Sequence, residues 1–125
     1  MILNDGGQPE TPNELFLQQI WRCQRIHREN LITADGQPLR ILHPGFWNHE
    51  AGPDFREAVI QIGSSAPIVG DIEIDLHPHN WKNHRHHKNS AYRSVVLHVV
   101  WHGESRAASD LPLLALKQIL DAPLS

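Results

Sequence analysis

Residues 52–55 (GPDF) and 70–76 (GDIEIDL) decide how this 125-residue chain folds, because they define the two strands of a pair. The Gly-Pro turn delivers Asp54 into an apolar run that predicts a strand over residues 55–62. The second stretch alternates acids with aliphatic side chains, which predicts a partner strand over residues 68–76. The Gly- and Ser-bearing turn between the two runs makes them a hairpin.

The acids of this hairpin form the first candidate site. Alternation places Asp71, Glu73 and Asp75 on one strand face. A turn centred midway between the strands sets Asp54 opposite Asp75 and beside Glu73. Clustered carboxylates suit Mg²⁺ or Mn²⁺, which can activate water for phosphodiester hydrolysis. The alternative is that Asp54 caps a turn while Asp71 and Asp75 face solvent.

Composition bounds the class of protein. Hydrophobic residues make up 40% and charged residues 20% of the chain, which is typical of a globular domain with one core. A net charge of −3 argues against a broadly basic surface, so any nucleic-acid contact would be local. The single Cys23 excludes an internal disulfide and a cysteine-built zinc site. Without a signal-peptide pattern or an apolar run of membrane length, we expect a cytoplasmic protein with no membrane contact.

A helix is predicted near the beginning of the chain. Residues 1–10 bear Gly and Pro, and we expect them to form a flexible N-terminus. Thr11 as N-cap, Pro12 at the first helical position and Glu14 as the capping-box acid predict the start of the helix. Its apolar spacing fades toward Asn30, where we expect the helix to end.

The remaining predicted elements are short. In chain order they are a hairpin of residues 31–33 and 38–43, a packed Gly- and Pro-rich loop over 43–53, an irregular crossover over 77–90, a central strand buried on both faces over 94–102, and a short helix or edge strand over 113–120. The order is α-β-β-β-(α)-β. It predicts an α/β fold with a mixed sheet, in one domain over residues 11–125.

Histidine is abundant, with ten in the chain and five of them between His77 and His87. His84 and His86, or His77 and His79, could chelate Zn²⁺ in an extended segment, with a carboxylate completing the set. The alternative is a polar loop exposed to solvent.

His98 interrupts the most apolar strand, where a polar group without a partner costs about 1–3 kcal/mol. Its ring either bonds to backbone or faces the acidic strand, with His102 on the same face. Trp81 and Tyr92 are candidates to stack on a substrate, and Arg85 is a candidate to meet its phosphate. Both aromatics could equally anchor the crossover to the core.

The chain also resembles a known family. The motifs that carry the resemblance are residues 41–45 (ILHPG), Trp47-Asn48, residues 51–55 (AGPDF), residues 70–74 (GDIEI), Trp81, His84, His86, Tyr92 and residues 96–100 (VLHVV). They are similar to those of the bacterial domain-of-unknown-function family 2851, from about Glu14 to about Leu116. Members of that family are much longer, so the chain resembles their N-terminal part. It departs from their pattern at Asp75 and Asn89, where histidine and aspartate are expected.

A second resemblance implies an activity. Asp54, followed nineteen residues later by Glu73-Ile74-Asp75, is similar to the PD-(D/E)XK nuclease pattern. In those nucleases the aspartate and the acid bind Mg²⁺, and the lysine assists the attacking water. The resemblance therefore implies a restriction-endonuclease-like core with Asp54 and Glu73 as metal ligands. Asp75 stands at the lysine position, so Lys82 or a histidine of the crossover would have to replace it.

Phosphodiester hydrolysis dependent on Mg²⁺ or Mn²⁺, with nucleic acid as the candidate partner, is the leading hypothesis. The candidate catalytic residues are Asp54, Glu73, Asp75 and His98. The candidate metal ligands are Asp54, Glu73, Asp75, His84 and His86. A competing hypothesis is a catalytically degenerate relative that acts as a binding or assembly module. A third is a zinc-dependent hydrolase that uses the His77–His87 loop.

Overall fold

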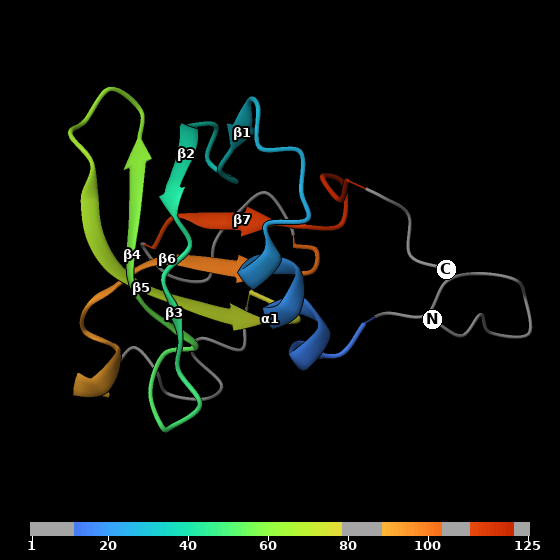
Figure 1. Cartoon of the computed structure of the whole chain (residues 1–125). Coiled ribbons are helices and arrows are strands. Elements are labelled where there is room, and N and C mark those ends of the chain that lie inside the picture. The colour runs from blue at the N-terminus through green and yellow to red at the C-terminus, as the bar shows by residue number, and fades with distance from the viewer. Residues whose placement is uncertain (1–11, 79–88, 104–110, 122–125) are drawn as a thin grey trace, which may run out of the picture.

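The computed structural model describes residues 12–78, 89–103 and 111–121, which form a curved sheet with an α-helix packed against it (Figure 1). Its elements are α1 (Glu14–Cys23), β1 (Leu31–Ile32), β2 (Pro38–His43), β3 (Phe46–Trp47), β4 (Phe55–Ile62), β5 (Ile68–Asp75), the 3₁₀ helix η2 (Ser90–Tyr92), β6 (Val95–Val100) and β7 (Leu113–Ala115). The strand order is β1-β2-β4-β5-β6-β7, with β3 paired to β4. Strands β5, β6 and β7 run parallel and the other pairs are antiparallel, so the sheet is mixed, as predicted.

Helix α1 is shorter than predicted. Asn13 caps it, because the Asn13 side chain accepts a hydrogen bond from the Phe16 N–H at 2.8 Å. The predicted helical Pro12 therefore precedes the helix, and Thr11 lies outside the described residues. The helix ends at Cys23 rather than near Asn30, because Gln24 adopts a left-handed conformation with φ 53° that stops helical propagation.

Both predicted hairpins are present. Strands β1 and β2 pair across a turn that contains Gly36, whose φ of +87° suits glycine. Strands β4 and β5 pair across residues 63–67, and β5 lies against α1. Of the predicted segment 113–120, only Leu113–Ala115 forms a strand, the edge strand β7, and turns follow it in place of a helix. The predicted flexible N-terminus lies outside the described residues.

Strand β6 is buried as predicted but does not lie at the centre of the sheet. It lies between β5 and the edge strand β7, while β4 and β5 occupy the middle, because β1 and β2 extend the sheet beyond β4. The close approach of β6 to β5 requires glycine at position 70. A Cβ atom there would lie 2.2 Å from Val96 Cγ1 and 2.8 Å from the Ser94 carbonyl oxygen.

The loop over residues 43–53 packs against the domain, as predicted. The Trp21 indole N–H donates to the Pro44 carbonyl at 2.9 Å, and the Trp47 ring stacks on the Phe55 ring at 6.1 Å between centroids. Trp21 and Phe55 are fully buried in a core that α1 and the strands share. This packing fixes the segment that leads into Asp54.

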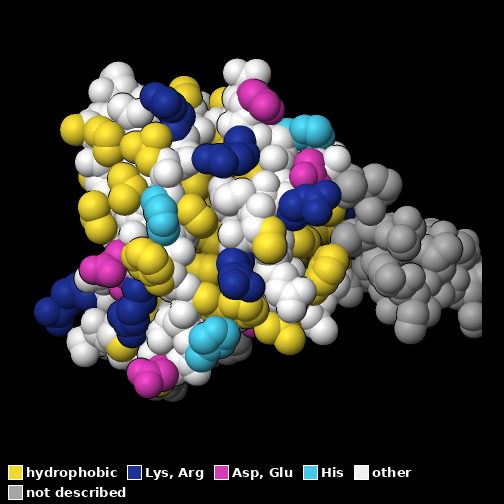
Figure 2. Space-filling view, viewed as in Figure 1, with side chains coloured by type: hydrophobic (Ala, Val, Ile, Leu, Met, Phe, Trp, Pro, Cys, Tyr) yellow, Lys and Arg dark blue, Asp and Glu magenta, His cyan; other side chains and the backbone are white. Residues whose placement is uncertain are grey.

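Some large hydrophobic side chains stay exposed. Figure 2 shows hydrophobic side chains gathered on the side of the molecule formed by the β4–β5 hairpin. The exposed large hydrophobic side chains of β2, β3 and β5 are Leu42, Phe46, Ile68 and Val69. In the described ranges no helix is long and apolar enough to cross a membrane.

Candidate carboxylate site

The register of the β4–β5 hairpin determines which acids meet. Phe55 pairs with Ile72, which puts Asp54 beside Glu73 rather than opposite Asp75. The predicted register was wrong by two residues. The pairing of Val59 with Val69 shows that the regular part of the ladder is shifted by one residue from the predicted turn centre, and a bulge just after Phe55 shifts it by one more. Asp54 and Glu73 are nevertheless neighbours, as the sequence predicted.

Asp71 stabilises this bulge. Glu57 is the bulged residue with φ 61°, and its N–H donates to Asp71 Oδ1 at 3.2 Å. Arg56 Nη1 lies 3.5 Å from Asp71 Oδ2. Asp71 is therefore buried, and the alternative that placed it in solvent is wrong. Its carboxylate accepts hydrogen bonds from a backbone and a side-chain donor of β4 and does not join the acids further along β5.

The carboxylate of Asp54 is held by donors from two elements. Asp54 Oδ2 accepts a hydrogen bond from the Ile74 N–H of β5 at 2.8 Å. Asp54 Oδ1 accepts one from Gln18 Nε2 of α1 at 3.0 Å. Glu73 also hydrogen-bonds to Asp54 through its carboxyl group. The two acids therefore form a pair whose orientation is set by the helix and by the neighbouring strand.

Burial makes this pair hold a proton. Desolvation and, to a smaller extent, the negative charges of Asp54 and Asp75 together raise the pKa of Glu73 to about 10. The pKa of Asp54 is raised as well, because desolvation outweighs the hydrogen bonds from Ile74 and Glu73. Glu14 of α1 adds a further negative charge that acts on Glu73. At neutral pH the pair therefore shares a proton, with Glu73 as its donor.

A second buried pair lies beside the first. His98 Nε2 lies 2.7 Å from Asp75 Oδ2, and both side chains are almost completely inaccessible to solvent. The parallel register of β5 and β6 places Glu73 next to His98. The ring of His98 therefore faces the acidic strand, and the alternative that placed Asp75 in solvent is wrong.

His102 does not share the face of His98. It follows the end of β6, is exposed, and its ring meets the ring of His77 edge-on at 5.4 Å. The strand ends at Val100, so the alternation that predicted a common face does not extend to position 102.

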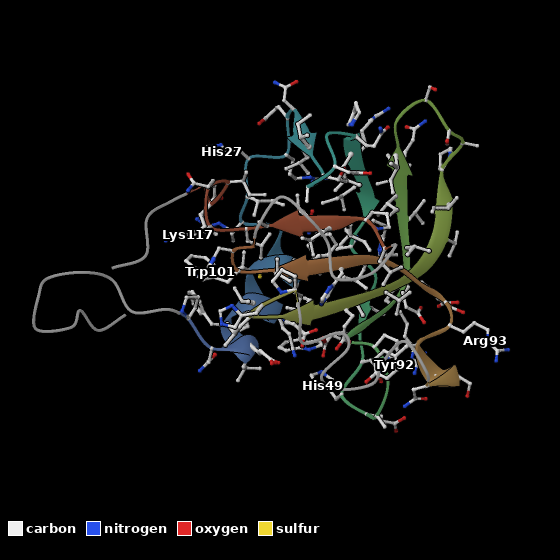
Figure 3. All side chains as sticks on the ribbon, turned by 180° about the vertical axis from the view of Figure 1, so that it is seen from behind. His27, His49, Tyr92, Arg93, Trp101 and Lys117 are labelled. Atoms are coloured by element: carbon white, nitrogen blue, oxygen red, sulfur yellow. The ribbon has the colours of Figure 1, made fainter. Side chains whose placement is uncertain are left out.

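Tyr92 lies close enough to the acids for their charges to act on its hydroxyl. Burial raises the pKa of Tyr92 to about 12, and the charges of Glu73, Asp54 and Asp75 contribute to this increase. In Figure 3, Arg93 points away from the molecule, whereas Tyr92 lies nearer to the strands. Tyr92 is thus a candidate substrate residue on which the charges of the carboxylate pair act.

Several predicted site residues lie outside the described residues. They are Trp81, His84, Arg85 and His86, together with His79 and Lys82. Within residues 12–78, 89–103 and 111–121, no group of three or more His, Cys, Asp or Glu side chains is arranged to hold a metal ion. The described part of the site therefore offers a pair of carboxyl groups, Asp54 and Glu73, with the Asp75–His98 pair beside it.

Two contributors to the site were not predicted from the sequence. Gln18 bonds to Asp54, and Trp47 Nε1 donates to Gln18 Oε1 at 2.8 Å. The one signal for Gln18 is its position four residues after Glu14, on the same helix face. A polar residue on a surface helix is too common for that spacing to identify a role.

Comparison with known proteins assigns the family. The model of a protein family of unknown function, DUF2851, matches residues 14–125. The chain belongs to the DUF2851 family. No curated protein and no solved structure matches it. All of the described candidate residues of the DUF2851 chain lie within the matched range.

Proposed function

We propose that this DUF2851 chain hydrolyses phosphodiesters with the help of a divalent cation bound by Asp54 and Glu73. The observation that supports this most strongly is the geometry of the pair. Two carboxyl groups meet where β4 enters the sheet beside β5, and one of them is fixed by hydrogen bonds from Gln18 and Ile74. Burying a fixed pair of acids lowers the stability of a fold, because both carboxyl groups lose their hydration. That cost favours a functional role for the pair.

The donor set fits Mg²⁺ or Mn²⁺. Mg²⁺ is commonly bound through one or two carboxylates, and waters and substrate phosphate oxygens complete its octahedron. The Asp54–Glu73 pair supplies two such hard oxygen donors from neighbouring strands. When bound, the cation would activate water and offset the charge that develops on the phosphate. It would also take the place of the proton that the two acids share.

The arrangement of the elements supports the same proposal. Helix α1 precedes the antiparallel strands β2, β4 and β5, and β6 returns parallel to β5 after a crossover. This order is similar to that of the PD-(D/E)XK nucleases, in which an aspartate and an acid of neighbouring strands bind Mg²⁺. We therefore propose a restriction-endonuclease-like core, in which Asp54 and Glu73 occupy the two acidic positions.

Asp75 stands where those nucleases have lysine, and its contact with His98 suggests a replacement. A carboxylate bonded to one nitrogen of a histidine fixes the orientation of the ring and its tautomer, which leaves the other nitrogen as the proton acceptor. We propose that His98, held by Asp75 at 2.7 Å, accepts the proton of the attacking water. In this scheme Asp75 orients His98 rather than acting as a third cation ligand.

Cleavage of labelled single- and double-stranded DNA and RNA with Mn²⁺ or Mg²⁺ tests this proposal. Wild type should cleave at least one substrate, and EDTA should stop the reaction. Asp54→Asn and Glu73→Gln should abolish cleavage, whereas the control Glu50→Gln, at an exposed loop position, should retain it. If wild type neither binds a divalent cation nor cleaves any of these substrates, the proposal is wrong.

A second candidate function is a binding or assembly module without turnover. Two observations favour it, namely the aspartate at the lysine position and the exposed side chains of Phe46 and Val69, which are 61% and 67% accessible. Self-association that is reversed by Phe46→Ser and Val69→Ser in sedimentation velocity, in a protein that does not bind Mn²⁺, would favour this module over the enzyme.

A further inference from the structure

Gln18 connects the carboxylate pair to the aromatic loop. Its side-chain amide accepts from the Trp47 indole N–H at 2.8 Å and donates to Asp54 Oδ1 at 3.0 Å. Gln18 lies on α1, Trp47 on β3, and Asp54 immediately before β4. The three side chains thus form a relay that joins three elements around the site.

The indole determines the orientation of the Gln18 amide. An indole N–H can only donate, so the group that faces Trp47 must be the amide oxygen. The amide NH₂ must then face Asp54, where it can only donate. A flipped amide would lose the hydrogen bond at both ends, so the orientation follows from the chemistry of Trp47.

Trp47 is itself held in place. Its ring lies parallel to that of the fully buried Phe55 within 13°, with 6.1 Å between the centroids. The Arg22 guanidinium carbon lies 5.3 Å from the centroid of the Trp47 ring. The relay therefore begins at a fixed aromatic ring and ends at the acid that we assign to the cation.

We propose that Gln18 is a positioning residue for the Asp54 carboxylate, oriented for this task by Trp47. The inference deepens the proposed function and rests on it for its consequence in cation binding. The Ile74 N–H holds Asp54 Oδ2, and the Gln18 amide holds Asp54 Oδ1. Together the two donors fix the rotation of the carboxylate about its Cβ–Cγ bond. This rotation decides which lone pairs of Asp54 point toward Glu73.

The relay predicts that a change at Asp54 alters the hydrogen bond of the Trp47 indole, and that it does so through the Gln18 amide. The indole N–H resonance of Trp47 is identified by its loss in Trp47→Phe. In the wild-type background, Asp54→Asn should shift this resonance, because it replaces an acceptor of the Gln18 amide. In the Gln18→Met background the same Asp54→Asn change should leave it unmoved. If Gln18 only supported the fold, Asp54→Asn would shift the indole resonance equally in the wild-type and Gln18→Met proteins.

Calorimetry with Mn²⁺ supplies the functional readout. Gln18→Met should weaken Mn²⁺ binding about tenfold, the effect of losing one hydrogen bond to a charged group. Gln19→Met, at the exposed neighbouring position, is the matched control and should bind like wild type. If Gln18→Met fails to fold, Gln18→Asn takes its place, since it keeps the amide but is too short to reach both partners.

The outcomes separate the two proposals. Indole coupling that disappears in the Gln18→Met background, together with weakened Mn²⁺ binding, supports both. The same coupling in a protein whose wild type binds no Mn²⁺ supports the relay and refutes the cation site. An indole shift that persists in the Gln18→Met background, or Mn²⁺ binding equal to that of the Gln19→Met control, overturns the role of Gln18.

Discussion

Replacing Glu73 by glutamine should remove a large part of the pH dependence of stability. Burial and the charges of Asp54 and Asp75 raise the pKa of Glu73 from 4.5 to about 10 in the folded protein. The folded state therefore holds this proton more tightly than the unfolded chain does. The stability that the proton contributes is fully present below about pH 4.5 and is lost as the pH rises toward 10.

The size of the effect follows from proton linkage. Between these two pKa values, one proton released on unfolding lowers the free energy of unfolding by about 1.4 kcal/mol for each pH unit gained. From pH 6 to pH 8, Glu73 should therefore reduce stability by roughly 3 kcal/mol. Glutamine resembles the protonated acid in shape and does not titrate, so Glu73→Gln should lack this decrease.

Urea unfolding followed by tryptophan fluorescence, in EDTA at several pH values, measures this difference. The variant should become more stable than wild type by an amount that grows with pH, because the other titrating groups are common to both proteins. Glu50→Gln, at an exposed position, should follow the wild-type curve. If the stability difference between wild type and Glu73→Gln is the same at pH 6 and pH 8, Glu73 does not carry a proton in the folded state.

Three further predictions concern the fold around the site. His98→Leu removes the partner of the buried Asp75 carboxylate at 2.7 Å and should lower the free energy of unfolding by about 3–5 kcal/mol in urea titrations; a loss under about 1 kcal/mol would contradict this. Gly70→Ala places a Cβ 2.2 Å from Val96 Cγ1 and should lower the free energy of unfolding by about 1–3 kcal/mol. Val96→Ala should recover part of this loss. An unchanged melting temperature of Gly70→Ala would show that β5 and β6 are further apart. Asn13→Ala should lower the free energy of unfolding by about 1 kcal/mol and speed hydrogen exchange of the backbone amides in the first turn of α1. Unchanged exchange would place the start of the helix elsewhere.

The strands of this fold could be predicted from the sequence because their patterns are local. Alternation over residues 68–76 and the apolar run over 94–102 predicted β5 and β6, and Gly-containing turns predicted both hairpins. The end of α1 could not be predicted, because Gln24 adopts a left-handed conformation that favours glycine and has no compositional signal. The position of β6 in the sheet depends on how many strands pair on each side of it, and no local pattern encodes this long-range pairing.

The candidate site was predicted in part for the same reason. The neighbourhood of Asp54 and Glu73 followed from the hairpin, but their register depends on a bulge at Glu57, which is not a glycine. The burial of Asp75 depends on His98, which approaches it from a parallel strand more than twenty residues away. Gln18 comes from a helix whose packing on the sheet the sequence does not specify.

Mn²⁺ calorimetry in two buffers of different ionisation enthalpy tests the cation site most directly, because it counts the protons released on binding. If the cation takes the place of the proton shared by Asp54 and Glu73, wild type at pH 7 should bind Mn²⁺ and release close to one proton per ion. Asp54→Asn and Glu73→Gln should bind at least about tenfold more weakly. Mn²⁺ binding without proton release, or equal binding by all three proteins, would contradict the assignment of the cation site to this pair.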